Sequence, residues 1–142
     1  MRVLWVAAVV LLACSAGDDD LLESLSALGI HDPGPVYVVS LAGWGGREQP
    51  VPDTVRVPPG AVVVFQVADF RVHTVTFAQD SLSSIQSGFI ARVARGQSPP
   101  LIERGSRYIV SFAEAPPGTY PFRIGGFGAS AGGAVVVVPG SP

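Results

Sequence analysis

Few side chains in this chain combine a reactive type with a spacing that could support chemistry. The sequence has one cysteine, one methionine and two histidines, at Cys14, Met1, His31 and His73. Asp69 precedes His73 by four positions. Such a pair could transfer a proton, although in a turn it more often orients the loop through a hydrogen bond. No motif brings His31 close to His73, so the histidines do not predict a joint site.

The other motifs that we considered also give no catalytic or nucleic-acid site. No G-x-S-x-G nucleophile motif occurs, and Cys14 lies in an N-terminal apolar segment, which makes it unavailable as a nucleophile. The glycine-rich residues 125–128 precede an expected strand, whereas phosphate is held at a helix N-terminus. All nine basic residues are arginines without a cluster, and the net charge is −2. We therefore expect no catalytic residues, no enzymatic activity and no nucleic-acid partner.

The elements that would position these residues are predicted to be strands in one all-β domain. Of the 142 residues 48% are hydrophobic, and 17 Gly and 13 Pro provide many turns. Tyr120, Phe122 and Ile124 alternate with Pro121 and Arg123, as in a half-buried strand. The run Val135–Val138 is typical of a strand buried on both faces. Further strands are expected at Val36–Leu41, Thr54–Val57, Ala61–Val67, Phe89–Val93 and Arg107–Phe112. Residues 42–52 are predicted to form a loop, with Trp44 as a buried plug for one barrel end; the alternative is a stacking platform for ligands.

Two stretches resemble the cupredoxins, the plastocyanin-like blue-copper proteins. The first is Asp69–Phe77, D-x-x-x-H-T-V-T-F, which contains His73. The second is Gly118–Val138, where the family reads roughly G-x-Y-x-F-x-C-x-x-H-x-x-x-x-M-x-G-x-V-x-V. The resemblance covers about residues 53–139. It implies a Greek-key β-sandwich or barrel of about seven or eight strands, with 61–67 and 134–138 as central strands.

The resemblance also implies which positions would bind copper. His73 is the one position that matches, whereas Ile124, Phe127 and Gly132 replace the Cys, His and Met ligands. A blue-copper site needs two His and a Cys thiolate, usually with a weak axial Met. We therefore expect no metal and no cofactor, with His73 as a hydrogen-bonded structural residue. The alternative is a small copper-binding electron-transfer protein of the plastocyanin type.

The N-terminus is predicted to carry a bacterial lipoprotein signal. Arg2 precedes an apolar core of about ten residues, too short for a membrane-spanning helix. The core ends in LLAC, which resembles the lipobox in which the Cys is lipidated, here Cys14. The alternative is an ordinary secretory signal with Cys14 incidental. The expected organisation is a signal peptide at 1–13, a lipidated tether with a short helix at 14–35, and the cupredoxin-like domain at 36–142.

Within that tether, SAGDDD is expected to be solvated, and a helix is expected over Leu21–Leu28. Asp20 would cap this helix and Gly29 would end it. The anchored protein would lie in the bacterial cell envelope, on the periplasmic or extracellular face.

With the copper ligands replaced, the sequence predicts a binding or structural module. In the family the loop at 125–132 lies at one end of the barrel, near an apolar patch that meets redox partners. Phe127, flanked by Gly126, Gly128 and Ala129, is therefore a candidate contact for an envelope protein or an apolar ligand. The alternative is that Phe127 turns inward and, with Ile124, fills the volume that a metal site would occupy.

Overall fold

The computed structural model describes residues 16–126 and 128–140, and it divides the chain into two units after His31. The first unit contains helix α1, Ala16–Ala27. Gly29, with φ of +78°, ends it as predicted, and the N–H of Ile30 donates to the carbonyl of Leu25.

The tether predicted before this helix is wrong in its conformation for Ala16–Asp20, which form the first turns of the helix; Asp19 and Asp20 are nevertheless exposed to solvent. Asp20 therefore lies inside the helix and does not cap it. Acidic side chains are favourable near a helix N-terminus, which explains why the aspartates extend the helix.

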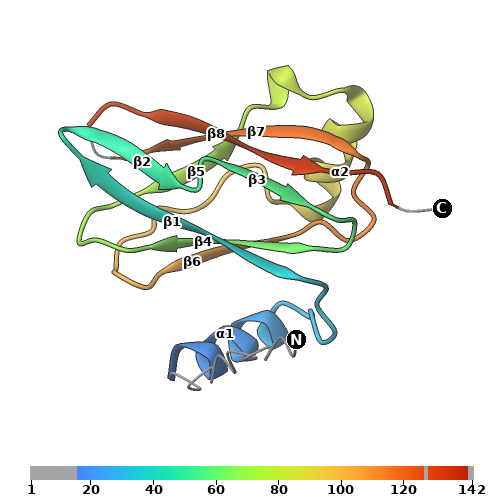
Figure 1. The fold of residues 1–142 in the computed structure, drawn as a ribbon, viewed down its shortest axis with the longest axis horizontal. Helices are drawn as coiled ribbons and strands as arrows, with labels where there is room; N and C mark the ends of the chain where they lie inside the picture. Colours follow the sequence, from blue (N-terminus) through green and yellow to red (C-terminus); the bar gives the residue numbers. More distant parts are fainter. Residues whose placement is uncertain (1–15, 127, 141–142) are drawn as a thin grey trace, which may run out of the picture. The chain divides into compact units, whose positions relative to one another are not determined.

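The second unit is a sandwich of two four-stranded sheets, as predicted (Figure 1). One sheet has the order β2-β1-β4-β6, and the other has the order β3-β8-β7-β5. The strands are β1 Val36–Trp44, β2 Arg47–Val51, β3 Thr54–Val57, β4 Val62–Val67, β5 Thr74–Phe77, β6 Arg107–Ser111, β7 Gly118–Gly125 and β8 Ala131–Val137. The predicted central strands, β4 and β8, both have neighbours on two sides, which confirms their placement.

The core between the sheets is rich in aromatic rings. Phe65 of β4 packs edge-on against Phe122 of β7, with ring centroids 5.0 Å apart. The inward side chains of β7 are Tyr120, Phe122 and Ile124, so the predicted alternation is confirmed. In β8, Val135 and Val137 are buried while Val136 is half-buried, so the prediction of burial on both faces is wrong. Because β8 lies in a two-layer sandwich, only one of its faces meets the core.

Residues 42–52, predicted to be a loop, instead continue β1 and form β2. Gly45 and Gly46 have φ of +60° and +76°, which is the geometry of a two-residue hairpin turn. The predicted plug, Trp44, is 75% exposed. In the two-residue period of β1, Val39 and Leu41 point into the core, so the side chain at position 44 points outward.

The predicted strand Phe89–Val93 is also wrong, because these residues belong to helix α2, Ser84–Val93. A capping box starts this helix: the N–H of Gln86 donates to the Ser83 hydroxyl, and the N–H of Ser83 donates to the Gln86 amide oxygen. A short 3₁₀ turn, Gln79–Ser81, precedes it. The helix lies at the end of the sandwich opposite the β1–β2 hairpin (Figure 1). In the described ranges, no helix is long and apolar enough to cross a membrane.

Candidate functional site

A cluster of one histidine and two acidic side chains, which we call the charged cluster, lies near the end of the sandwich that carries the β1–β2 hairpin. Its centre is His73, at the start of β5, whose side chain is fully buried. Nδ1 of His73 lies 2.6 Å from Oε2 of Glu48, which is also buried, on β2. Nε2 of His73 lies 2.7 Å from Oδ1 of Asp69, in the loop between β4 and β5. Both ring nitrogens therefore face a carboxylate of this chain.

Asp69 connects this cluster to two backbone segments. Its Oδ2 accepts a hydrogen bond from the N–H of Gly43 at 2.8 Å, and its Oδ1 accepts another from the N–H of Arg71 at 3.1 Å. Partial burial works to raise the pKa of Asp69, but the hydrogen bonds from His73, Gly43 and Arg71 outweigh it. The pKa of Asp69 therefore lies below its ordinary value, and this carboxyl group is ionised at neutral pH.

The two short contacts of His73 require two protons. A neutral imidazole carries only one N–H, and an ionised carboxylate only accepts. The arrangement is satisfied by an imidazolium between two carboxylates or by a neutral imidazole next to one protonated carboxyl group. In either form the cluster joins the hairpin, the β4–β5 loop and the start of β5 through charge-assisted or short hydrogen bonds.

The β7–β8 loop packs against the same end of the sandwich. Gly126, with φ of +120°, lies against the carbonyl of Val72, and Gly128, with φ of +73°, lies against the carbonyl of Gly46. A Cβ atom at either glycine would clash with backbone, so these positions require glycine. Ala129 accepts a hydrogen bond from the N–H of Glu48 at 2.9 Å. The loop is thereby held next to the charged cluster.

Four large apolar side chains are exposed on the segments that surround the cluster. Trp44 follows Gly43, whose N–H binds Asp69, and Phe70 follows Asp69 itself. Val72 precedes His73, and Leu101 bridges to His73, which places Ile102 nearby. The exposed fractions are 75% for Trp44, 85% for Phe70, 39% for Val72 and 65% for Ile102. We call these four residues the apolar end surface.

Three solved structures show what this sandwich is similar to. Over 71% of this chain and 99% of the other, it superposes on oxidised plastocyanin from Dryopteris crassirhizoma, with 20% identity and a TM-score of 0.55. Over 78% of this chain but only 24% of the other, it superposes on the copper-containing nitrite reductase of Thermus scotoductus, with 19% identity and a TM-score of 0.53. The fold is that of a cupredoxin.

The third structure is a Cu(I) form of an amicyanin mutant, with 18% identity and a TM-score of 0.49 over 72% of this chain and 81% of the other. No family model and no curated protein matches the sequence.

The structure describes three of the four positions that the resemblance aligns with copper ligands, namely His73, Ile124 and Gly132. His73 is buried in the charged cluster. Ile124 is fully buried on β7 and belongs to the apolar core. Gly132 lies on β8 in a groove beside β2. Phe127 and the predicted lipidation site, Cys14, lie outside the described residues.

The remaining members of the predicted contact surface, Gly126, Gly128 and Ala129, are exposed in the β7–β8 loop. The hydrogen bond expected between Asp69 and His73 is present. Glu48, the second partner of His73, is not among the site residues that the sequence predicts. Its burial follows the alternation of buried and exposed residues along β2. The prediction of a loop at residues 42–52 gives no reason to look for such an alternation there.

Proposed function

We propose that this chain is an envelope lipoprotein whose cupredoxin-like domain carries no type 1 copper and binds a protein partner at the apolar end surface. The observation that carries the proposal is that the exposed side chains of Trp44 and Phe70 lie beside the charged cluster. Both ring nitrogens of His73 are already bonded, one to Glu48 and the other to Asp69. Fold alone does not determine activity, so these side chains, and not the cupredoxin fold, support the proposed binding role.

The donor set supports the proposal that type 1 copper is not bound. Such a centre needs a thiolate, and the only cysteine in the sequence is Cys14, in the predicted lipoprotein signal. Ile124 and Gly132 offer no side-chain donor. A metal at His73 would have to displace either Glu48 at Nδ1 or Asp69 at Nε2. Among the described residues no group of three or more His, Cys, Asp or Glu side chains could hold a metal ion.

Titration of the purified chain with Cu(II) is expected to give no intense blue charge-transfer band, because that band requires a copper–thiolate bond. Absorption spectroscopy measures it directly, and metal analysis of protein isolated from the envelope gives the copper content. Plastocyanin, treated identically, is the positive control. Stoichiometric copper in the isolated protein, or a blue wild type, would support the electron-transfer alternative and refute this part of the proposal.

The envelope location is proposed from the sequence of the N-terminus. A lipid-modified Cys14 would attach the domain to a membrane, and multiple acyl chains would make the attachment stable. No catalytic constellation was found in the sequence, and the likeness to nitrite reductase covers only 24% of that chain. We therefore infer a binding role in the envelope rather than an enzymatic one.

The mature wild-type protein is expected to begin at Cys14 and to carry acyl chains, whereas a Cys14→Ser variant should carry none. Intact-protein mass spectrometry measures the difference, and membrane fractionation should show that the variant leaves the lipid-anchored fraction. A Ser15→Ala variant, which changes the neighbouring residue, is the control. Equal mature masses for the wild type and Cys14→Ser, apart from the sulfur-to-oxygen exchange, would rule out lipidation.

The partner proposed for the apolar end surface is a protein with an apolar contact area and acidic side chains at its rim. Large aromatic side chains are enriched at interface centres, and exposed apolar clusters often mark interfaces. The guanidinium of Arg104 lies 5.6 Å from the centre of the Phe70 ring and is positioned to meet a carboxylate beside that contact. Phe127, in the β7–β8 loop, remains a predicted further contact.

A further inference from the structure

A seam between β2 and β8 is closed by backbone hydrogen bonds of two flanking residues, Ala129 before β8 and Asp53 after β2, and it is open in the middle. At one end, the N–H of Glu48 donates to the carbonyl of Ala129 at 2.9 Å. At the other end, the N–H of Ala134 donates to the carbonyl of Asp53 at 2.8 Å. Between these bonds, no backbone hydrogen bond joins the strands in the part of the chain that the structure describes. Pro50 and Pro52 lack an N–H, so this stretch cannot close as a ladder.

The open part of the seam presents backbone groups of both kinds. Because the N–H of Ala134 points toward the seam, the two-residue period of a strand points the N–H and carbonyl of Gly132 the same way. The N–H of Glu48 also points toward the seam, so the carbonyl of Pro50, two residues on, does so as well. One donor and acceptor pair on β8 therefore faces an acceptor on β2.

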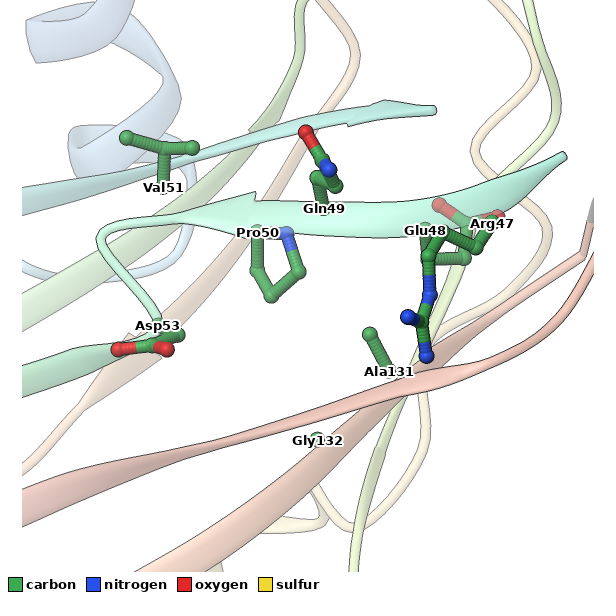
Figure 2. Close-up of a pocket in the computed structure, with 8 residues that line it drawn as sticks. All are labelled: Arg47, Glu48, Gln49, Pro50, Val51, Asp53, Ala131 and Gly132. Carbon is green, nitrogen blue, oxygen red and sulfur yellow. The ribbon is translucent and has the colours of Figure 1, made fainter. Parts of the chain in front are cut away.

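This seam contains a groove of about 330 Å³, at the lower end of the range for small-molecule sites. Figure 2 shows the guanidinium of Arg47 and the carboxylate of Asp53 on opposite sides of Pro50, with Gly132 on the facing strand. The side chains of Arg47 and Asp53 are exposed. The groove therefore has a cation near the start of β2, an anion beyond its end, and backbone hydrogen-bonding groups between them.

We propose that this groove binds a short peptide with free termini, extended and antiparallel to β2. The bridge between Arg47 and Ala129 is parallel, so β2 and β8 run in the same direction. A peptide that is antiparallel to β2 is therefore antiparallel to β8 as well. In the antiparallel orientation the peptide carboxylate meets Arg47 and its ammonium group meets Asp53. The parallel orientation would bring like charges together at both ends, which disfavours it.

The backbone contacts follow the general mode of strand addition, in which an extended peptide pairs with an open sheet edge. A peptide N–H donates to the carbonyl of Pro50, and a peptide carbonyl accepts from the N–H of Gly132. These contacts do not depend on the ligand's side chains, so small residues suffice. The groove is distinct from the apolar end surface, and this inference does not rest on the proposed partner.

The test uses the full-length chain and three probes: trialanine, N-acetyl-trialanine and trialanine amide. Backbone amide shifts, followed by NMR during titration, are expected to saturate with trialanine at the residues of 47–53 that carry an N–H and at 131–132; Pro50 and Pro52 have no amide signal. Acetylation removes the ammonium charge and amidation removes the carboxylate, so each should weaken binding about tenfold or more, as for loss of a hydrogen bond to a charged group.

Two matched variants assign the charges. In Asp53→Asn, acetylation of the probe should change the dissociation constant by less than about twofold, while amidation should still weaken binding about tenfold. In Arg47→Gln, amidation of the probe should change the dissociation constant by less than about twofold, while acetylation should still weaken binding about tenfold. Both side chains are exposed, so the fold should survive either change. The proposal is overturned if no probe saturates at millimolar concentration, if the shifts lie outside the groove, or if both variants respond alike to the two caps.

Discussion

With His73 as an imidazolium between its two carboxylates, a Glu48→Leu variant is expected to lose about 3–5 kcal/mol of unfolding free energy, the usual cost of removing one member of a buried ion pair. The substitution leaves Nδ1 of His73 without its partner at a position that water does not reach. The same change also removes a contact between β2 and the start of β5, so the end of the sandwich that carries the hairpin should loosen. Urea-induced unfolding at neutral pH, monitored by circular dichroism, measures the loss.

The control is the double variant Glu48→Leu with His73→Leu. Replacing a buried pair by apolar residues is often neutral or stabilising, so the double variant should be more stable than either single one. Asp69 would keep its hydrogen bonds from the N–H groups of Gly43 and Arg71 and its partial exposure to solvent. A single-variant loss below about 1 kcal/mol, or two single losses that simply add, would show that the cluster does not act as a pair.

The sequence predicted the sandwich because its strands alternate apolar and polar residues. Tyr120, Phe122 and Ile124 are buried as their spacing required. Strand β2 was missed since Pro50 and the neighbouring glycines indicate a loop. An edge strand tolerates proline, and β2 is an edge strand, so tertiary position overrides that local signal. The double glycine at 45–46 was in fact a hairpin signal.

Helix α2 was missed for a different reason. A short apolar run such as 89–93 is ambiguous between strand and helix when only periodicity is considered. The capping box formed by Ser83 and Gln86 was visible in the sequence as S-x-x-Q, and it could have resolved the ambiguity.

One of the two side-chain contacts of His73 could be predicted from the sequence, and the other could not. Asp69 and His73 are four positions apart in one loop, so local spacing suggests their hydrogen bond. Glu48 is 25 positions from His73, and only the placement of β2 beside the β4–β5 loop brings the two side chains together. The apolar end surface has the same origin, because Trp44 ends β1 and Phe70 lies in the β4–β5 loop, and the Gly43–Asp69 hydrogen bond joins these two segments. A single sequence carries no signal for such long-range pairings.

Phe70→Asp and Trp44→Asp variants are expected to lose partner binding almost completely while keeping their stability. Aromatic residues at an interface centre commonly contribute about 2 kcal/mol or more each, which is roughly a thirtyfold change in affinity. Both side chains are exposed, so the free energy of unfolding should change by only about 0.5 kcal/mol. A photocrosslinking residue at Ile102, which follows the Leu101 bridge to His73, should form one discrete protein adduct in the envelope, and each variant should abolish it.

Ile85→Asp is the matched control, because Ile85 is 71% exposed but lies on α2, at the opposite end of the sandwich. It adds the same charge to a similarly exposed apolar position, so it should leave the adduct intact. If all three variants reduce the adduct equally, the effect comes from net charge and not from the apolar end surface. An adduct with lipid in place of protein would instead show that this end of the domain faces the membrane. The melting temperature of each variant is measured alongside its crosslinking. A variant that loses the adduct because it is unfolded would then be recognised by its lowered melting temperature.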